Sequence, residues 1–205
     1  RQPWDYSEEI AACAISYLKL RYSLLPHIYS TAVESCITGE PVCRALVLDY
    51  ADDPTVRNLD DEYIFCHDML VAPMFQERGE RKIYLPKGTW IDFWSHEVCE
   101  GGRWITRYYP LERLPLFVKG GSILLKTDPG EFIDSQKTWD QLTLEIYPGP
   151  GGKKIVHLDA HHTGSVRVQV KNDGIYVTTA NILSRLTIRL IGGEQKKCFL
   201  NGYAL

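Results

Sequence analysis

Helical periodicity is confined to the first third of this 205-residue chain, and short apolar runs separated by turn residues follow it. After residue 140, apolar residues recur at every second position, as in Leu142, Leu144 and Ile146. This period is typical of antiparallel strands with one buried and one solvated face. We therefore expect a mainly β fold with helices only near the start of the chain.

The first third of the chain predicts two helices. Apolar residues follow helical spacing over residues 10–32, and Gly39 is a typical stop signal. Asp5 with Glu8 three residues later resembles a capping box, so the first helix should begin there. Pro26 removes a backbone donor and clashes with the preceding turn, so the two helical stretches should meet beside this proline.

The segment that follows is interpreted as α/β architecture. Residues 42–50 are largely apolar on both faces, which predicts a buried strand of a parallel sheet. Residues 59–66 read as a short helix after a polar loop. Because one such strand cannot close a sheet, it needs partners from elsewhere.

Two all-β units are expected after residue 68, with a boundary near residues 128–140. An apolar run covers residues 69–75, strands are predicted at 82–85 and 90–94, and two more in 114–125 are separated by Gly120-Gly121. Asn172-Asp173-Gly174 between two alternating runs predicts a β-hairpin.

Composition excludes several classes of protein. The net charge is −3, with 23 basic and 26 acidic residues, so no basic face for nucleic acid is indicated. No apolar run approaches the roughly 20 residues of a membrane span. The chain starts at Arg1 without an initiator Met, so we expect a cut there rather than a natural start.

The cysteine pattern favours reduced thiols. The six cysteines contain no Cys-x-x-Cys pair, which argues against a zinc ribbon or a thioredoxin-type site. No Asn-x-Ser/Thr sequon occurs. A cytoplasmic location is therefore expected.

Six sequence blocks together resemble glycoside hydrolase family 31, the α-glucosidases and α-xylosidases. The blocks occur in the family's order and are LRYSLLPHIY (20–29), PVCRAL (41–46), DDP (52–54), LVAPM (70–74), YLPKGTWIDFW (84–94) and LPLFVKGGSI (114–123).

The resemblance implies a domain order. In that family a (β/α)₈ barrel precedes a proximal and a distal β-sandwich domain. Residues 1–68 then correspond to the end of the barrel, 69–128 to the proximal domain and 129–205 to the distal domain. A whole barrel needs roughly 250 residues, so only its last helices and last strand are expected, followed by two antiparallel β-sandwich domains.

The resemblance also implies a function for the parent protein. Family members hydrolyse α-glycosidic bonds with retention, using two Asp residues that lie upstream of the matching segment. We therefore expect the C-terminal part of an enzyme that removes terminal α-linked glucose or xylose from oligosaccharides. Neither catalytic residue, nor a metal or organic cofactor, is assigned to this chain.

Two departures from the family pattern are visible. Cys66-His67-Asp68 stands where members usually have Gly before the next strand, so a left-handed backbone angle should be absent there. His157-Leu158-Asp159-Ala160-His161-His162 replaces a stretch common in the distal domain, so that domain should differ in detail.

Asp49 and Tyr50 are the only residues whose predicted place faces a substrate mouth, and they are the candidates for substrate binding. They end the predicted barrel strand and would face the substrate mouth, where we expect them to support other residues rather than contact the sugar. The pairs Asp52/Asp53 and Asp60/Asp61 are rejected as a catalytic dyad because adjacent side chains point in different directions.

Two further groups of residues have both a structural and a functional interpretation. His157, Asp159 and His161 alternate and could offer zinc ligands together with His162, but a polar hairpin is favoured. His27 could pair with a cysteine nucleophile, and packing is again favoured. The cysteines near His27 in sequence are Cys13, Cys36 and Cys43.

A group of aromatic residues leaves an alternative function open. Such rings could stack on sugars, although the core of a β-sandwich and its domain interface explain them better. The group is Trp90, Phe93, Trp94, Trp104, Tyr108 and Tyr109. The alternative is a non-catalytic carbohydrate-binding or assembly module.

The expected partner of this chain is the remainder of the catalytic barrel. It could lie on the same polypeptide or on a separately encoded chain, and a homo-oligomer is compatible with the sequence. The parent enzyme would bind an oligosaccharide, and no nucleic acid or membrane is implied.

Overall fold

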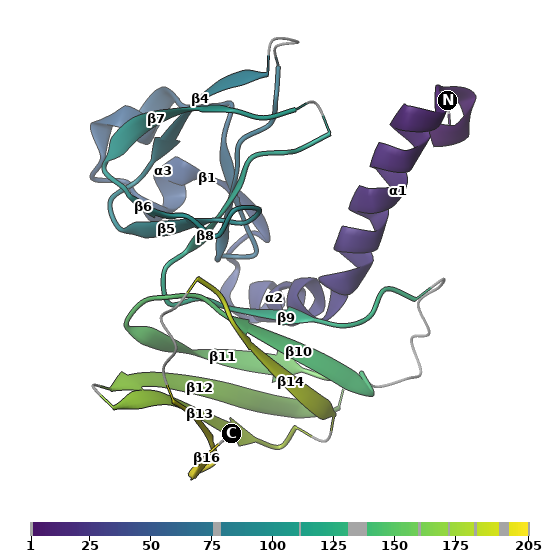
Figure 1. Ribbon diagram of the computed structural model, residues 1–205. Helices are drawn as coiled ribbons and strands as arrows, with labels where there is room; N and C mark the ends of the chain where they lie inside the picture. The colour runs from purple at the N-terminus through teal and green to yellow at the C-terminus, as the bar shows by residue number, and fades with distance from the viewer. Residues whose placement is uncertain are drawn as a thin grey trace.

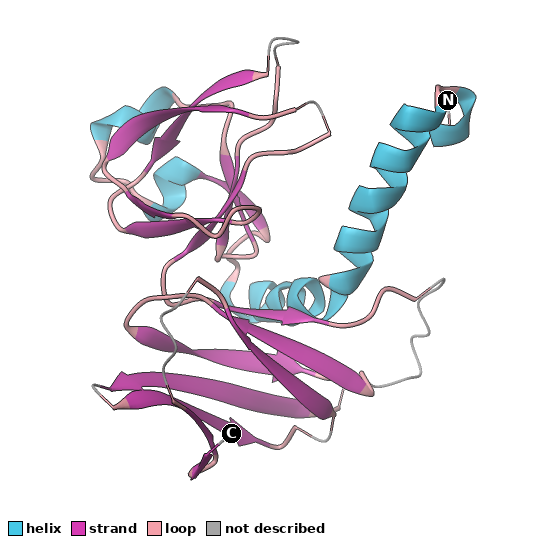
Figure 2. Ribbon diagram, viewed as in Figure 1, coloured by secondary structure: helices cyan, strands magenta, loops and turns pink. Residues whose placement is uncertain are grey.

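The computed structural model describes residues 2–75, 79–110, 112–130, 139–159, 161–171, 173–182, 184–192 and 197–204. Two helices come first, and two β units follow that lie one above the other in Figure 1. Figure 2 shows that strands dominate. The fold is mainly β, as predicted.

The two expected helices are present. Helix α1 spans Glu8–Ser23 and α2 spans Leu25–Thr38, with Pro26 in the first turn of α2. Gly39 ends α2 with a φ of 79°, a left-handed conformation that glycine adopts without steric cost.

The predicted start of the first helix is wrong by a few residues. Ser7 is the N-cap of α1, and its Oγ accepts a hydrogen bond from the backbone N–H of Ile10 at 3.4 Å. Asp5 instead ends a short 3₁₀ turn, η1 (Pro3–Asp5), and accepts from the backbone N–H of Gln2. Both Asp and Ser favour N-caps, so the sequence did not choose between them.

The first β unit is a six-stranded sheet covered by a two-stranded ladder, β4 (Glu80–Leu85) with β7 (Arg103–Tyr108). All pairs in it are antiparallel. The order in the sheet is β1 (Cys43–Ala45), β2 (Tyr63–Phe65), β3 (Met69–Val71), β8 (Leu116–Lys119), β5 (Thr89–Asp92) and β6 (Val98–Glu100). The core between sheet and ladder includes Leu46, Ile83, Leu85, Trp90 and Phe117.

The predicted strand over residues 42–50 is wrong in extent and in pairing. Only β1 is extended there, it pairs antiparallel with β2, and the chain continues as helix α3 (Leu46–Asp49). The predicted helix at 59–66 is also wrong, since a 3₁₀ turn, η2 (Pro54–Asn58), precedes β2. An apolar run alone does not distinguish a buried strand from a helical turn.

The second β unit is a sandwich of two sheets. Its core includes Ile123, Leu125, Leu142 and Leu144 from one sheet and Val156, Val166, Val168 and Val177 from the other. The first sheet has the order β14 (Arg185–Leu190), β10 (Gln141–Ile146) and β9 (Ile123–Lys126). The second has the order β11 (Gly151–His157), β12 (Thr163–Lys171), β13 (Gly174–Ala180), β15 (Cys198–Leu200) and β16 (Tyr203–Ala204).

The sandwich is not wholly antiparallel. β10 pairs with β14 and β13 pairs with β15 in parallel, because the chain visits the opposite sheet between the two strands of each pair. The hairpin expected between two alternating runs joins β12 to β13, with Lys171 opposite Gly174. Asn172 of its turn lies outside the described residues.

Sheet membership differs from the predicted division at two places. β1 and β2, within the predicted barrel segment 1–68, belong to the same sheet as β3. β9, which precedes the expected boundary near 128–140, pairs with β10 of the second unit. Residues 131–138 of that boundary lie outside the described residues.

Glycines join the two β units. Gly121 follows β8 with a φ of 84°, and its N–H donates to the carbonyl of Pro148. A Cβ on Gly149 would lie 2.3 Å from the backbone nitrogen of Gly121. Only a residue without a side chain fits between these two segments.

We expect Gly149→Ala to destabilise the chain by about 1–3 kcal/mol, since the added methyl must displace backbone rather than a flexible side chain. Urea denaturation measures the change. Gly88→Ala is the matched control: its φ is also positive, at 133°, but no atom lies within 4 Å of its Cβ. Equal losses for the two variants would contradict this steric explanation.

Candidate functional site

A buried ionic cluster lies where α2 and the two β units meet. Asp68, in the turn between β2 and β3, lies 3.0 Å from Nζ of Lys154 on β11 and 3.2 Å from Nε2 of His27 on α2. His27 is fully buried, and its Nδ1 accepts from the backbone N–H of Leu125 at 3.4 Å. Three segments distant in sequence are thus joined by one carboxylate.

Burial and charge set the protonation states of this cluster. Burial alone would raise the pKa of Asp68, but the hydrogen bond from His27 and the charge of Lys154 outweigh it and hold that pKa well below its usual range. Burial, followed by the charge of Lys154, lowers the pKa of His27. Asp68 and Lys154 therefore form the ion pair, and neutral His27 is a hydrogen-bond partner.

Sequence reasoning did not single out this cluster. Lys154 shares the inward face of β11 with Val156, so period-two alternation places a charge among core positions. That signal was available in the sequence. Its partner Asp68 could not be identified, because the two residues are 86 positions apart.

We expect Asp68→Asn to destabilise the chain by about 3–5 kcal/mol, because Lys154 would remain buried without a counter-charge. Asp68→Asn with Lys154→Met should recover most of that loss. Chemical denaturation measures both variants. A double variant as unstable as the single one would show that the unpaired charge is not the cause.

The stability of the chain at acid pH should also depend on the Asp68–Lys154 ion pair. Because the pKa of Asp68 is lowered by folding, its contribution is complete above the unfolded pKa of about 4 and is lost as the pH falls below that value. The Asp68→Asn variant should lack this part of the acid dependence.

The hairpin turn before β3 is left-handed, contrary to the expectation from its missing glycine. Cys66 and His67 have φ values of 54° and 65°. Phe65 pairs with Met69, and the N–H of Lys119 bonds to the carbonyl of Asp68. These tertiary hydrogen bonds hold the angle that glycine would adopt without strain.

Asp49 and Tyr50 lie beside this turn. Asp49 ends α3, where its two carboxylate oxygens lie 2.7 and 2.9 Å from Nε and Nη2 of Arg44. Arg44 also contacts His67. Burial raises the pKa of half-buried Tyr50 to about 12. Both side chains are engaged within the fold, and their supporting role at a substrate mouth stays a prediction.

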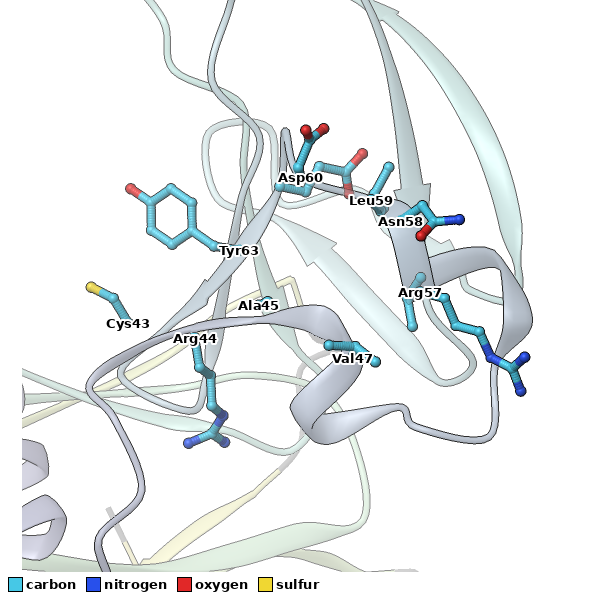
Figure 3. Close-up of a pocket in the computed structure, with 11 residues that line it drawn as sticks. Cys43, Arg44, Ala45, Val47, Arg57, Asn58, Leu59, Asp60 and Tyr63 are labelled. Carbon is cyan, nitrogen blue, oxygen red and sulfur yellow. The ribbon is translucent and has the colours of Figure 1, made fainter.

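A pocket of about 700 Å³ opens between β1, β2 and η2 (Figure 3). Asp60 and Tyr63 are among its lining residues, whereas Asp49 and Tyr50 are not. The lining also includes Cys43, Arg44, Val47, Arg57, Asn58 and Glu62.

Glu62 lines this pocket and carries a buried carboxyl group. Its side chain is fully buried, and Oε1 accepts from the backbone N–H of Tyr84 at 2.8 Å. The nearest guanidinium nitrogen of Arg81 is 4.0 Å away. Burial therefore raises the pKa of Glu62 to about 7.

We expect the stability of the chain to fall as the pH rises from about 4.5 to above 7, since folded Glu62 holds its proton more tightly than the unfolded chain does. Glu62→Gln should remove this dependence and stabilise the chain at pH 8 by roughly 3 kcal/mol at most. Thermal denaturation across this range measures it. Glu100→Gln, at an exposed position, is the control and should keep the wild-type profile.

Members of the two adjacent acidic pairs make structural contacts. Asp53 caps η2 by accepting from the N–H of Thr55, and it accepts from the Tyr84 hydroxyl at 2.6 Å. Asp61 pairs with Arg81 at 2.8 Å, while Asp60 lines the pocket. Asp53 thus caps a turn and Asp61 forms an ion pair within the fold.

The histidine-rich stretch is a polar hairpin, as favoured. Asp159 accepts from the backbone N–H groups of His161 and His162, and its Oδ2 lies 2.7 Å from Nδ1 of His162. His157 ends β11. In the described part of the chain, no three His, Cys, Asp or Glu side chains are grouped to hold a metal.

His27 is a packing histidine in the ionic cluster. Within the described residues, its contacts are Asp68 and Leu125 rather than a cysteine. All six cysteines are free thiols. The expectation of a buried structural histidine is confirmed.

The aromatic group divides into core and surface. Trp90, Phe93 and Tyr109 are buried, and the Tyr109 hydroxyl donates to Asp92 at 2.6 Å. Trp94 is half-buried. Trp104 and Tyr108 are exposed. A structural role is confirmed for the buried members only.

Comparison with known proteins assigns the family. The model of the glycosyl hydrolase family 31 C-terminal domain matches residues 39–124. Over 154 residues the chain is 36% identical to Alpha-glucosidase 2 of Bacillus thermoamyloliquefaciens, covering 75% of this chain and 19% of the relative. The chain belongs to glycoside hydrolase family 31.

Two further matches to family 31 proteins support this assignment. An Alpha-xylosidase of Saccharolobus solfataricus is 36% identical over 155 residues, covering 74% of this chain and 21% of the relative. A Flavobacterium johnsoniae GH31 dextranase structure has a TM-score of 0.85 at 26% identity, covering 100% of this chain and 28% of that one.

The family 31 chain spans about a fifth of the length of these curated relatives. In the longer relatives the corresponding segment is part of a larger polypeptide. No helix within the described ranges is long and apolar enough to cross a membrane.

Proposed function

We propose that this chain is the C-terminal part of a retaining α-glycosidase that removes terminal α-linked glucose or xylose from oligosaccharides. Relatives named as α-glucosidases and α-xylosidases support this substrate class. The chain contains no assigned catalytic carboxylate, so it is inactive by itself. The fold braces a catalytic domain that lies upstream.

The observation that carries this proposal is the bare apolar surface of α1. The helix stands to one side of the first β unit in Figure 1 and contacts it through Tyr17, but none of its residues is buried. Ile10, Ile15 and Leu18 are each about half exposed, and Trp4 and Tyr6 precede them. Apolar side chains exposed together on one helix indicate a surface that a partner covers.

That partner is the rest of a (β/α)₈ barrel. In the proposal, α1 and α2 are the last barrel helices, and residues 69–128 and 129–205 form the proximal and distal domains. β1 lies at one edge of the described six-stranded sheet, beside the 700 Å³ pocket. The upstream segment would cover both this edge and α1, with Asp49 and Tyr50 supporting the substrate mouth.

The proposal places both parts on one polypeptide in the cytoplasm. The longer relatives support a single polypeptide, and the free cysteines favour a reducing compartment. Intact-mass analysis of the native protein distinguishes the two arrangements: a mass well above 23.4 kDa supports one chain, and a separate barrel subunit contradicts it.

We expect the 205-residue chain alone to give no turnover of aryl α-glucosides or α-xylosides. Co-expression with the segment encoded before Arg1 should restore hydrolysis. Leu18→Asp should impair this restoration at least tenfold without unfolding the chain, because the residue is exposed in isolation.

Val170→Asp, on the far sheet of the second β unit, is the control and should leave restoration unchanged. Enzyme-like turnover by the isolated chain would refute the proposal.

A further inference from the structure

Two exposed aromatic rings lie on the outer face of β7. Trp104 is 41% exposed and Tyr108 is 74% exposed, whereas the neighbouring aromatic residues Trp90 and Tyr109 are buried. β4 and β7 form the end of the first β unit that is farthest from the second β unit in Figure 1. No part of the proposed function uses these two rings.

The strand pairing places both rings on one side. Trp104, Thr106 and Tyr108 alternate with the less exposed Ile105 and Arg107, so they share the outer face of β7. Trp104 and Tyr108 are four positions apart on the strand, or about 13 Å along β7. One sugar ring cannot contact both aromatic rings, but an oligosaccharide can.

Polar groups from β4 flank the rings. Lys82 pairs with Thr106, and Glu80 pairs with Tyr108, in the antiparallel register. Tyr84 packs against Trp104 with ring centroids 5.2 Å apart and holds the indole in place. One ammonium and one carboxylate give this face no net charge, which suits a neutral ligand.

Such a face has the chemistry that recognises carbohydrate. Indole and phenol rings stack on the C–H faces of pyranose rings, and the ammonium, carboxylate and hydroxyl groups beside them bind sugar hydroxyls. Lys82 Nζ lies 4.7 Å from the Trp104 ring centroid. Because Lys82 is exposed, its ammonium can move aside and donate to a sugar hydroxyl.

We propose that the outer face of β4 and β7 is a binding surface for α-linked gluco-oligosaccharides, with Trp104 and Tyr108 as its two stacking platforms. The choice of α-linked glucose rests on the proposed function. Binding here would hold a chain-like substrate on the enzyme between successive cleavages.

Isothermal titration of the 205-residue chain with isomaltopentaose tests the proposal. We expect saturable binding, and much weaker binding of glucose, which can contact only one ring. Trp104→Ala and Tyr108→Ala should each raise Kd at least about fivefold, as expected when a stacking aromatic group is lost.

Tyr203→Ala is the matched control. Tyr203 is 78% exposed on β16, in the other β unit, so its loss should leave Kd unchanged. An unchanged Kd in Trp104→Ala and Tyr108→Ala would overturn the proposal, as would equal affinity for cellopentaose.

Sedimentation of the same variants tests whether a second copy of the chain, rather than a sugar, covers the two rings. A dimer that dissociates on Trp104→Ala would overturn the proposal, because a second copy of the chain would then cover the rings. Restored hydrolysis of a small aryl α-glucoside does not require this face. Failure of co-expression to restore this hydrolysis would therefore refute the proposed function. Unaltered oligosaccharide binding by the Trp104→Ala and Tyr108→Ala variants would refute only the proposed binding surface.

Discussion

The buried Asp68–Lys154 ion pair, with His27 beside it, is the interaction on which the arrangement of the chain depends. Each member comes from a different part of the fold: the β2–β3 turn, β11 and α2. A buried charge is tolerated only with a partner of opposite charge, so displacing one of these segments would leave its group unpaired. The ion pair therefore joins the two β units, and buried His27 packs α2 against their junction.

That rigid junction determines how α1 is presented. α1 follows the direction set at Leu24, where it meets α2, and leaves Ile10, Ile15 and Leu18 uncovered. Tyr17 anchors its middle by accepting from the N–H of Leu114 and donating to the carbonyl of Glu112. A fixed helix with a bare surface is consistent with a chain that braces another domain.

Sequence reasoning succeeded where the signal was local. Proline and glycine marked the helix boundaries at Pro26 and Gly39, and alternation marked β10, β12 and β14. It failed over residues 42–66, where apolar continuity predicted a parallel strand and a helix. There, pairing of β1 with β2 decided the structure, and this pairing depends on residues about 20 positions away.

By itself, the sequence determined the family, the mainly β composition and the helix-then-strand order, because these depend on local periodicity and on blocks of adjacent residues. Only the tertiary structure decided that Asp68 meets Lys154, that Glu62 is buried beside a pocket, and that two of six neighbouring aromatic residues remain exposed. Burial and charge pairing are properties of segments that meet in space. Their energies depend on the distance between groups and on the surrounding dielectric, which no local pattern encodes.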